Sequence, residues 1–221
     1  MTQELWTAVD SYIVDTLLPP DDALARAVKA SDEAGLPSIQ VSPPQGRFLQ
    51  MLAKVQGARR ILEIGTLGGY STIWLARALP GDGRMVTMEI DPRHAEVARS
   101  NIEFAGLSDK VRVLNGDAHD LLATLESEID APFDFTFIDA DKASIPQYFE
   151  SALRMSRPGS LILIDNVVRE GAVIHAESAD AAVQGVRKVN EMISSNARVT
   201  ATVIQTVGVK GYDGLAIALV S

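Results

Sequence analysis

The stretch from Arg60 to Ser71, which reads RILEIGTLGGYS, decides the fold of this chain. Its first half, Arg60 to Gly65, is a short apolar run closed by glycine, which is typical of a buried strand. The glycines let the backbone turn tightly and let a ligand approach it closely. A helix is expected directly afterwards, over residues 71–79. This stretch therefore predicts a strand, a glycine-rich turn and a helix.

The alternation of strand and helix continues along the chain. Helices separate further strands, which are predicted at residues 84–90, 111–115, 133–139, 160–165, 199–205 and 215–220. Strands that alternate with helices form right-handed βαβ units and a mostly parallel sheet. The last two strands are joined by a glycine-rich turn and form a hairpin, so one edge strand should run antiparallel. We therefore expect an α/β fold with a Rossmann-like, doubly wound sheet of seven strands.

The residues before this sheet have a different pattern and are predicted to be helical. Pro19 and Pro20 would end a first helix, and Pro43 would lie in the first turn of a third. No linker, repeat or low-complexity tract divides the chain. We expect a single domain over 1–221, with a helical region at 1–58 and a cofactor-binding sheet core at 59–221.

Composition excludes several classes of function. The chain of 221 residues has 29 acidic and 20 basic side chains, a net charge of −9, and 47% apolar residues. This acidic balance, without a basic cluster, argues against nucleic acid and anionic membranes as partners. The absence of cysteine excludes disulfides, thiolate zinc sites and a cysteine nucleophile. Without a signal peptide or a long apolar run, a cytoplasmic protein is expected.

Acidic residues at the predicted strand ends indicate a binding crevice. Glu63 interrupts a buried strand, where a carboxylate is costly unless it meets a partner. Glu89 ends the next strand, roughly 20 residues beyond the glycine loop, where nucleotide folds bind ribose hydroxyls. Gly116 and Asp117 after the third strand could frame an adenine or only cap a helix. A dinucleotide is the minor option, because Leu67 stands where its fingerprint needs glycine.

The fourth and fifth strands end in residues that suit a metal ion. Asp139 follows the fourth strand, and Asp165 and Asn166 end the fifth. The carboxyl ends of neighbouring parallel strands share one crevice, so these side chains should converge. Hard oxygen ligands without nearby cysteine or histidine suit Mg²⁺ or Ca²⁺. The alternative is that each aspartate caps a helix or turn.

Together these motifs resemble the class I S-adenosylmethionine-dependent O-methyltransferases of the catechol and caffeoyl-CoA type. The resemblance runs from about Ser42 to Ala218 and rests on LEIGTLGGYS, IDADK, IDN and YDGLAIAL, which occur in the family's order. It implies S-adenosylmethionine (SAM) as the methyl donor and a divalent cation, Mg²⁺ first, with Ca²⁺ or Mn²⁺ as alternatives. It also implies a homodimer.

The resemblance further implies a role for each matching residue. For the cofactor, Glu63 and Ser71 would hold the methionine end, Glu89 would bind the ribose, and Val41 would close over it. The remaining cofactor residues would be the loop residues Gly65, Thr66, Gly68 and Gly69, the adenine-lining Ile90, Gly116, Asp117 and Ala118, and Asp139. The metal would be held by Asp139, Asp165 and Asn166. Lys142 and Asp139 would be catalytic, with Lys142 acting at the substrate hydroxyl.

We therefore expect cation-dependent methyl transfer from SAM to a hydroxyl of a small catechol-like phenol. A phenylpropanoid CoA ester or another hydroxyl is the alternative acceptor. A nicotinamide-dependent oxidoreductase would need a tighter glycine fingerprint and a proton donor such as Tyr-x-x-x-Lys, and the sequence has neither. A non-catalytic cofactor-binding protein is disfavoured by the intact acidic and lysine positions.

Overall fold

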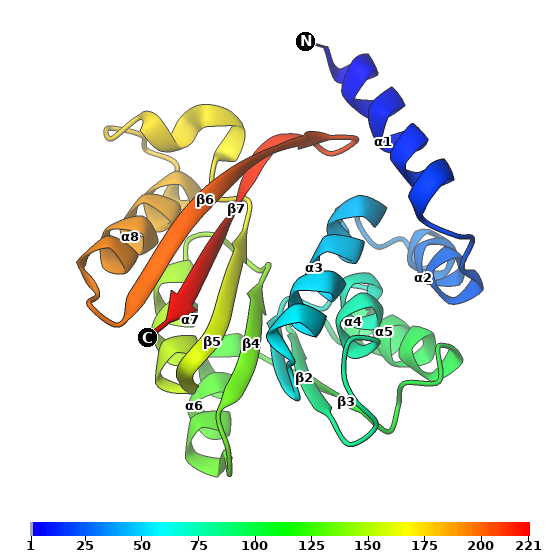
Figure 1. Cartoon of the computed structure of the whole chain (residues 1–221), viewed down its shortest axis with the longest axis horizontal. Coiled ribbons are helices and arrows are strands. Elements are labelled where there is room, and N and C mark those ends of the chain that lie inside the picture. The colour runs from blue at the N-terminus through cyan, green and yellow to red at the C-terminus, as the bar shows by residue number, and fades with distance from the viewer. Residues whose placement is uncertain (1) are drawn as a thin grey trace.

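A central sheet with helices on both faces forms the core of the computed structural model, which describes residues 2–221 (Figure 1). The strands are β1 (Arg60–Ile64), β2 (Arg84–Glu89), β3 (Val111–Asn115), β4 (Phe133–Ile138), β5 (Ser156–Asp165), β6 (Val199–Gly208) and β7 (Gly211–Val220). They confirm the seven-stranded α/β sheet.

The sheet has the order β3-β2-β1-β4-β5-β7-β6, and all its strands are parallel except β7. The expected antiparallel strand from the C-terminal hairpin is confirmed, but its expected place at the edge of the sheet was wrong. β7 pairs with β5 on one side and β6 on the other, so β6 forms the edge. The helix before β6 carries the chain back along the sheet, so β6 runs parallel to β5. The strand that returns from the hairpin, β7, runs antiparallel and lies between β5 and β6.

Each face of the sheet is covered by its own group of helices (Figure 1). One face packs against α2 (Asp22–Glu33), α3 (Pro43–Gln56), α4 (Tyr70–Ala76) and α5 (Pro92–Phe104). The other packs against α6 (Ala118–Glu128), α7 (Ile145–Arg154) and α8 (Ala181–Ser195). Side chains alternate across β1, so that Ile61 faces the first group while Leu62 faces the second. This alternation points Glu63 towards α4.

Helix α1 (Gln3–Leu17) lies apart from the core and has no buried residue. It reaches the tip of the β6–β7 hairpin (Figure 1). There the Gln3 side chain donates to the carbonyl of Gly208 at 2.9 Å, and Asp10 accepts from the amide of Val209 at 2.7 Å. The predicted helical region thus contains three helices, of which the second and third join the core.

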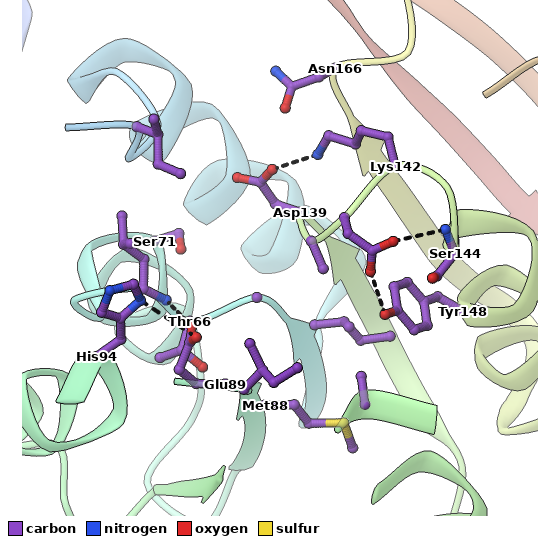
Figure 2. Close-up of a pocket in the computed structure, with 18 of the residues that line it drawn as sticks. Thr66, Ser71, Met88, Glu89, His94, Asp139, Lys142, Ser144, Tyr148 and Asn166 are labelled. Atoms are coloured by element: carbon purple, nitrogen blue, oxygen red, sulfur yellow. Dashed lines mark hydrogen bonds and ion pairs between the residues drawn. The ribbon is translucent and has the colours of Figure 1, made fainter. Parts of the chain in front are cut away.

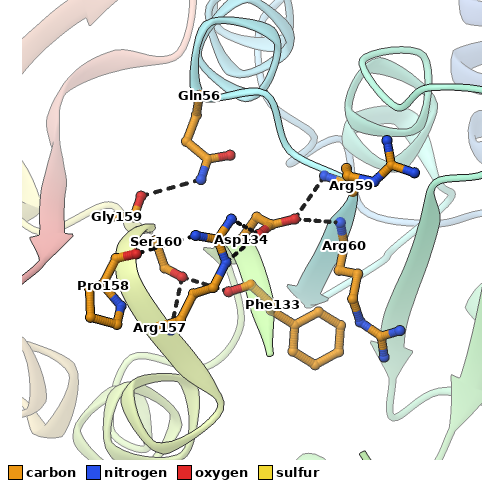
Figure 3. A network of polar contacts seen from close by, with 9 residues as sticks. All are labelled: Gln56, Arg59, Arg60, Phe133, Asp134, Arg157, Pro158, Gly159 and Ser160. Carbon is orange, nitrogen blue, oxygen red and sulfur yellow. Dashed lines mark hydrogen bonds and ion pairs between the residues drawn. The ribbon is translucent and has the colours of Figure 1, made fainter. Parts of the chain in front are cut away.

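A buried carboxylate ties strands together at the amino-terminal end of the sheet (Figure 3). Asp134 in β4 accepts from the backbone amides of Arg59 and Arg60, at 2.8 and 2.9 Å, and from two nitrogens of Arg157. β5 begins at Ser156, four residues earlier than predicted. Ser156 pairs with Phe133 of β4, and a shift of register separates this pair from the next one, Phe135 with Leu161.

The chain after β5 contains a short 3-10 helix, η1 (Arg169–Ile174), that the sequence did not predict. Among the helices of residues 2–221, none is both long and apolar enough to cross a membrane.

Candidate active site

A cavity of about 740 Å³ opens where the parallel strands end (Figure 2). It extends from Glu89, Ile90 and His119 at one end to Asp139, Lys142 and Asn166 at the other. Of the residues that the sequence analysis assigned to the site, those that line the cavity are Val41, Gly65, Thr66, Ser71, Glu89, Ile90, Gly116, Asp117, Ala118, Asp139, Lys142 and Asn166. The structure therefore brings together in one crevice most of the positions singled out from the sequence.

Four predicted residues lie behind the cavity wall instead of lining it: Glu63, Gly68, Gly69 and Asp165. Gly68 packs against α2, where an added Cβ would lie 2.0 Å from the Ser31 hydroxyl. Gly69 begins α4 with a left-handed φ of 84°. These glycines shape the loop through packing and backbone conformation.

The glycine loop is held close to β2 and β4. Gly65 has a φ of 100°, and a Cβ there would lie 2.1 Å from the carbonyl oxygen of Asp139. Only glycine fits such a conformation and such an approach. Leu67 is also left-handed, with a φ of 49°, and its amide donates to Glu89 at 2.7 Å. The loop therefore takes a turn in which a leucine adopts a conformation that glycine usually supplies.

Glu63 lies fully buried beneath this loop. Its carboxylate accepts hydrogen bonds from three hydroxyls, those of Ser71, Thr72 and Thr87. Burial raises the pKa of Glu63 from 4.5 to about 7, against the opposing effect of these hydrogen bonds. Within residues 2–221, Ser71 alone of this group also lines the cavity, so Glu63 is connected to the cavity through the Ser71 hydroxyl.

Glu89 lines the cavity, and each of its carboxylate oxygens accepts a hydrogen bond from a backbone amide. One oxygen accepts from Leu67, and the other accepts from the amide of Asp91 at 3.0 Å. Asp117 caps α6 by accepting from the amide of His119 at 2.8 Å, and it also lines the cavity. The two interpretations of Asp117, cap and cavity wall, are therefore compatible.

The opposite end of the cavity gathers acidic and amide oxygens beside one lysine. Lys142 lies 2.9 Å from Asp139, and Asn166 points towards the same place (Figure 2). Behind them Asp165 accepts from the Gln45 side chain at 2.7 Å and from the amide of Asn166 at 2.8 Å. Burial, and then the charge of Asp139, raise the pKa of Asp165 well above its usual range.

Asp141, which lies between Asp139 and Lys142 in the chain, contacts a different part of the cavity wall. Its carboxylate accepts from the Tyr148 hydroxyl at 2.7 Å and from the amide of Ser144 at 3.0 Å (Figure 2). Tyr148 in turn packs on His119, with ring centroids 5.1 Å apart. The sequence did not single out Tyr148, because no local spacing relates a residue of α7 to the loop before it.

Within residues 2–221 there is no cluster of three or more histidine, cysteine, aspartate or glutamate side chains placed to hold a metal. The set predicted here has two carboxylates, Asp139 and Asp165, and the carboxamide of Asn166. Gln45 is the further amide that contacts this set, and it comes from the first turn of α3.

The model of a family described as O-methyltransferase matches residues 19–219 of the chain. The catechol O-methyltransferase of Niastella koreensis is 53% identical over 220 residues, which cover all of both chains. An O-methyltransferase of Bacillus cereus in complex with S-adenosylhomocysteine (SAH) has 56% identity and a TM-score of 0.98, with full coverage of both chains.

The O-methyltransferase TomG of Streptomyces achromogenes, involved in tomaymycin synthesis and solved in complex with SAM, is 52% identical with a TM-score of 0.97. The match covers 100% of this chain and 99% of TomG. These matches favour methyl transfer over the nicotinamide chemistry that the glycine loop left as a minor option. The chain belongs to the O-methyltransferase family and is an enzyme that uses SAM as its methyl donor.

Proposed function

We propose that the acceptor is a vicinal aromatic diol and that a divalent cation holds it for methylation. The observation that carries this proposal is the convergence of Asp139, Lys142 and Asn166 at one end of the cavity (Figure 2), with the buried carboxylate of Asp165 behind them. The name of the Niastella koreensis relative, a catechol O-methyltransferase, supports the same acceptor.

The residues at this end fit a hard divalent cation. Burial and the charge of Asp139 disfavour the ionised form of Asp165, and a cation would relieve both costs. Carboxylate and amide oxygens are the ligands that Mg²⁺ and Mn²⁺ prefer. Asp139, Asp165 and Asn166 would hold the ion, and Gln45 would fix the orientation of Asp165. Bound there, the cation would supply Lewis acidity to a chelated diol.

The protein residues then divide the remaining work. Glu89 is expected to hold the ribose of SAM, and Ser71, oriented by Glu63, its methionine end. Lys142, as the neutral amine that a neighbouring divalent cation would favour, would accept the proton of the attacking hydroxyl. The new bond forms between that oxygen and the methyl carbon, while the bond from sulfur to methyl breaks and SAH leaves. Since the sulfonium carbon is already electrophilic, alignment is the main contribution of the site.

A methylation assay with SAM and catechol tests the proposal. We expect activity to disappear in EDTA and to return with Mg²⁺ or Mn²⁺. Asp165→Ala should bind SAM in calorimetry, fail to bind Mn²⁺ in electron paramagnetic resonance, and turn over poorly. Full activity in chelator would contradict the metal assignment, and a preference for caffeoyl-CoA over catechol would contradict the acceptor.

A further inference from the structure

A strained bend follows the last predicted metal residue and places an arginine at the cavity. Asn166, Arg169 and Glu170 have φ values of 59°, 55° and 54°, in the left-handed region that side chains other than glycine rarely adopt. Such backbone persists only where the surrounding structure holds it, and it concentrates at functional sites.

Asp213 of β7 holds the bend. Its Oδ1 accepts from the amides of Val168, Arg169 and Gly214, at 2.9, 3.0 and 2.8 Å. These three hydrogen bonds to a single oxygen of Asp213 fix the backbone of Arg169. The position of Arg169 is thus determined by β7 and does not depend on any contact of its own side chain.

The Arg169 side chain is partly buried and lines the cavity together with Lys142 and Asn166. Its Nε is shielded from solvent and makes no hydrogen bond. Within residues 2–221 none of its guanidinium nitrogens forms a hydrogen bond or an ion pair. A guanidinium is always charged and offers five donors, so a donor such as Nε that is shielded from water without a partner is costly.

Other arginines of this fold show what such a group normally does. Arg77 pairs with Asp21 through two nitrogens, Arg154 with Glu126 and Arg157 with Asp134. Arg77 and Arg154 make the two-pronged contact with both carboxylate oxygens that the guanidinium geometry favours, and both nitrogens of Arg157 donate to one oxygen of Asp134. Arg169 has the same donors and lines the cavity, and within residues 2–221 its guanidinium forms no ion pair with a protein carboxylate.

The charges around the cavity strengthen this contrast. Lys142 is paired with Asp139, and Lys210, on the nearby hairpin, donates to the carbonyl of Ser38 at 3.0 Å. Within residues 2–221, Arg169 is therefore the cation without a protein partner beside Asp139, Lys142 and Asn166, in a protein whose net charge of −9 would otherwise repel an anion.

We propose that Arg169 recognises a carboxylate on the acceptor, so that the substrate class is aromatic vicinal diols bearing a carboxylate. This inference rests on the proposed function, because it names the acceptor of that reaction. Arg169 lies three residues beyond Asn166 in the chain. A ring whose diol meets the metal residues would present its carboxylate to the guanidinium.

The test compares protocatechuate, a catechol carboxylate, with its neutral methyl ester, whose ring is activated to a similar degree. We expect the wild-type protein to prefer the acid by about 10–100-fold in kcat/KM, the range expected for a charged two-pronged contact. In Arg169→Gln this ratio should fall to about 1. Glu170→Gln, the neighbouring left-handed and exposed position, should keep the wild-type ratio.

Calorimetry with the SAH-loaded protein provides a readout that does not depend on turnover. Arg169→Gln should lose affinity for protocatechuate but not for SAH. An equal ratio in wild type and Arg169→Gln, or no preference in wild type, would overturn the inference. If the ester is methylated in an Mg²⁺-dependent manner and Arg169→Gln changes nothing, the inference about Arg169 is wrong but the proposed function is supported. Arg169-dependent binding without methylation of either compound would overturn the proposed function alone.

Discussion

Glu63 is a carboxyl group without exposure to solvent, surrounded by hydroxyls and apolar side chains. Because burial raises its pKa from 4.5 to about 7, the folded protein binds more protons than the unfolded chain between those values. The free energy of unfolding contributed by this group therefore falls as pH rises through that window, by at most about 1.4 kcal/mol per pH unit.

Glu63→Gln should remove this slope. We expect urea denaturation from about pH 5 to pH 8 to show a smaller loss of stability in the variant than in the wild type. Glu128→Gln, at an exposed position of α6, serves as the control and should follow the wild-type profile. Parallel profiles for Glu63→Gln and wild type would show that the buried carboxyl does not titrate in this range.

Lys142 carries the prediction for catalysis. Lys142→Ala should lower kcat by about 10²–10⁴-fold while calorimetric SAM affinity stays near wild type, because proton transfer is lost and the cofactor contacts remain. Lys142→Arg keeps the charge beside Asp139 but cannot accept a proton. If Lys142→Arg recovers the wild-type kcat, the lysine serves only to position Asp139.

Residue types at strand ends could be predicted from the sequence, because the carboxyl ends of parallel strands meet at one edge. That rule placed Glu89, Asp139 and Asn166 at one crevice. It could not predict the left-handed backbone of Arg169, which depends on Asp213, 44 residues later in the chain. Contacts of this kind are set by the completed sheet and leave no local pattern.

At the scale of elements, Asp134 joins the start of β4 to β1 and β5 (Figure 3). Although burial alone would raise it, hydrogen bonds from Arg59, Arg60 and Arg157 hold the pKa of Asp134 below its usual range. Its stabilising contribution is therefore present at neutral pH and lost as pH falls through the lowered pKa.

Asp134→Asn should destabilise the fold by about 2 kcal/mol at neutral pH, since a charged acceptor of several hydrogen bonds is lost. Thermal denaturation would show the difference from wild type shrinking as the pH falls below the ordinary aspartate pKa, because Asp134 then loses the charge that its hydrogen bonds stabilise. Glu126→Gln, which breaks a more exposed pair with Arg154, should cost far less. A similar cost for the two variants would contradict this account of the sheet end.

Helix α8 supports the loop that carries Lys142. A Cβ at Gly185 would lie 2.1 Å from the carbonyl oxygen of Lys142 and 2.9 Å from the Cα of Ala143. Alanine normally stabilises a helix by about 1 kcal/mol relative to glycine. Here Gly185→Ala should instead lower both the melting temperature and kcat, because backbone atoms must move. Gly81→Ala, where open space surrounds the added carbon, should change neither.

The order of strands and helices followed from apolar runs and their spacing, and the structure agrees on all seven strands. The start of β5 was missed because Arg157, Pro158 and Gly159 are typical of a turn. In the structure these residues belong to β5 at a shift of its register with β4, where the Ser160 hydroxyl donates to the carbonyl of Phe133 at 2.7 Å. Tertiary contacts thus extended a strand where local propensity indicated a loop.

For the whole molecule we propose a homodimer in which α1 and the edge strand β6 contact the partner. α1 has no buried residue, yet it exposes Leu5, Val9 and Tyr12. β6 is exposed over residues 200–207, and it carries Val203, Ile204 and Val207. A long apolar edge strand left in water invites further pairing, so a stable protein needs it covered.

Light scattering at micromolar concentration should give twice the chain mass. The double variant Tyr12→Glu, Val207→Lys should give the mass of one chain, because charges would replace apolar contacts at both elements. Val55→Glu, at an exposed position of α3, is the control and should remain dimeric. A single-chain mass for the wild type would refute the proposal.

The place of β7 between β5 and β6 also bears on how the chain folds during synthesis. The inner strand is made after both of its neighbours, so β5 keeps an open edge until residue 220 has left the ribosome. Since β6 and β7 are adjacent in sequence, their hairpin can close in microseconds and then dock as one unit. Asp213 arrives with that unit, so the bend that presents Arg169 to the cavity is completed only when the hairpin docks.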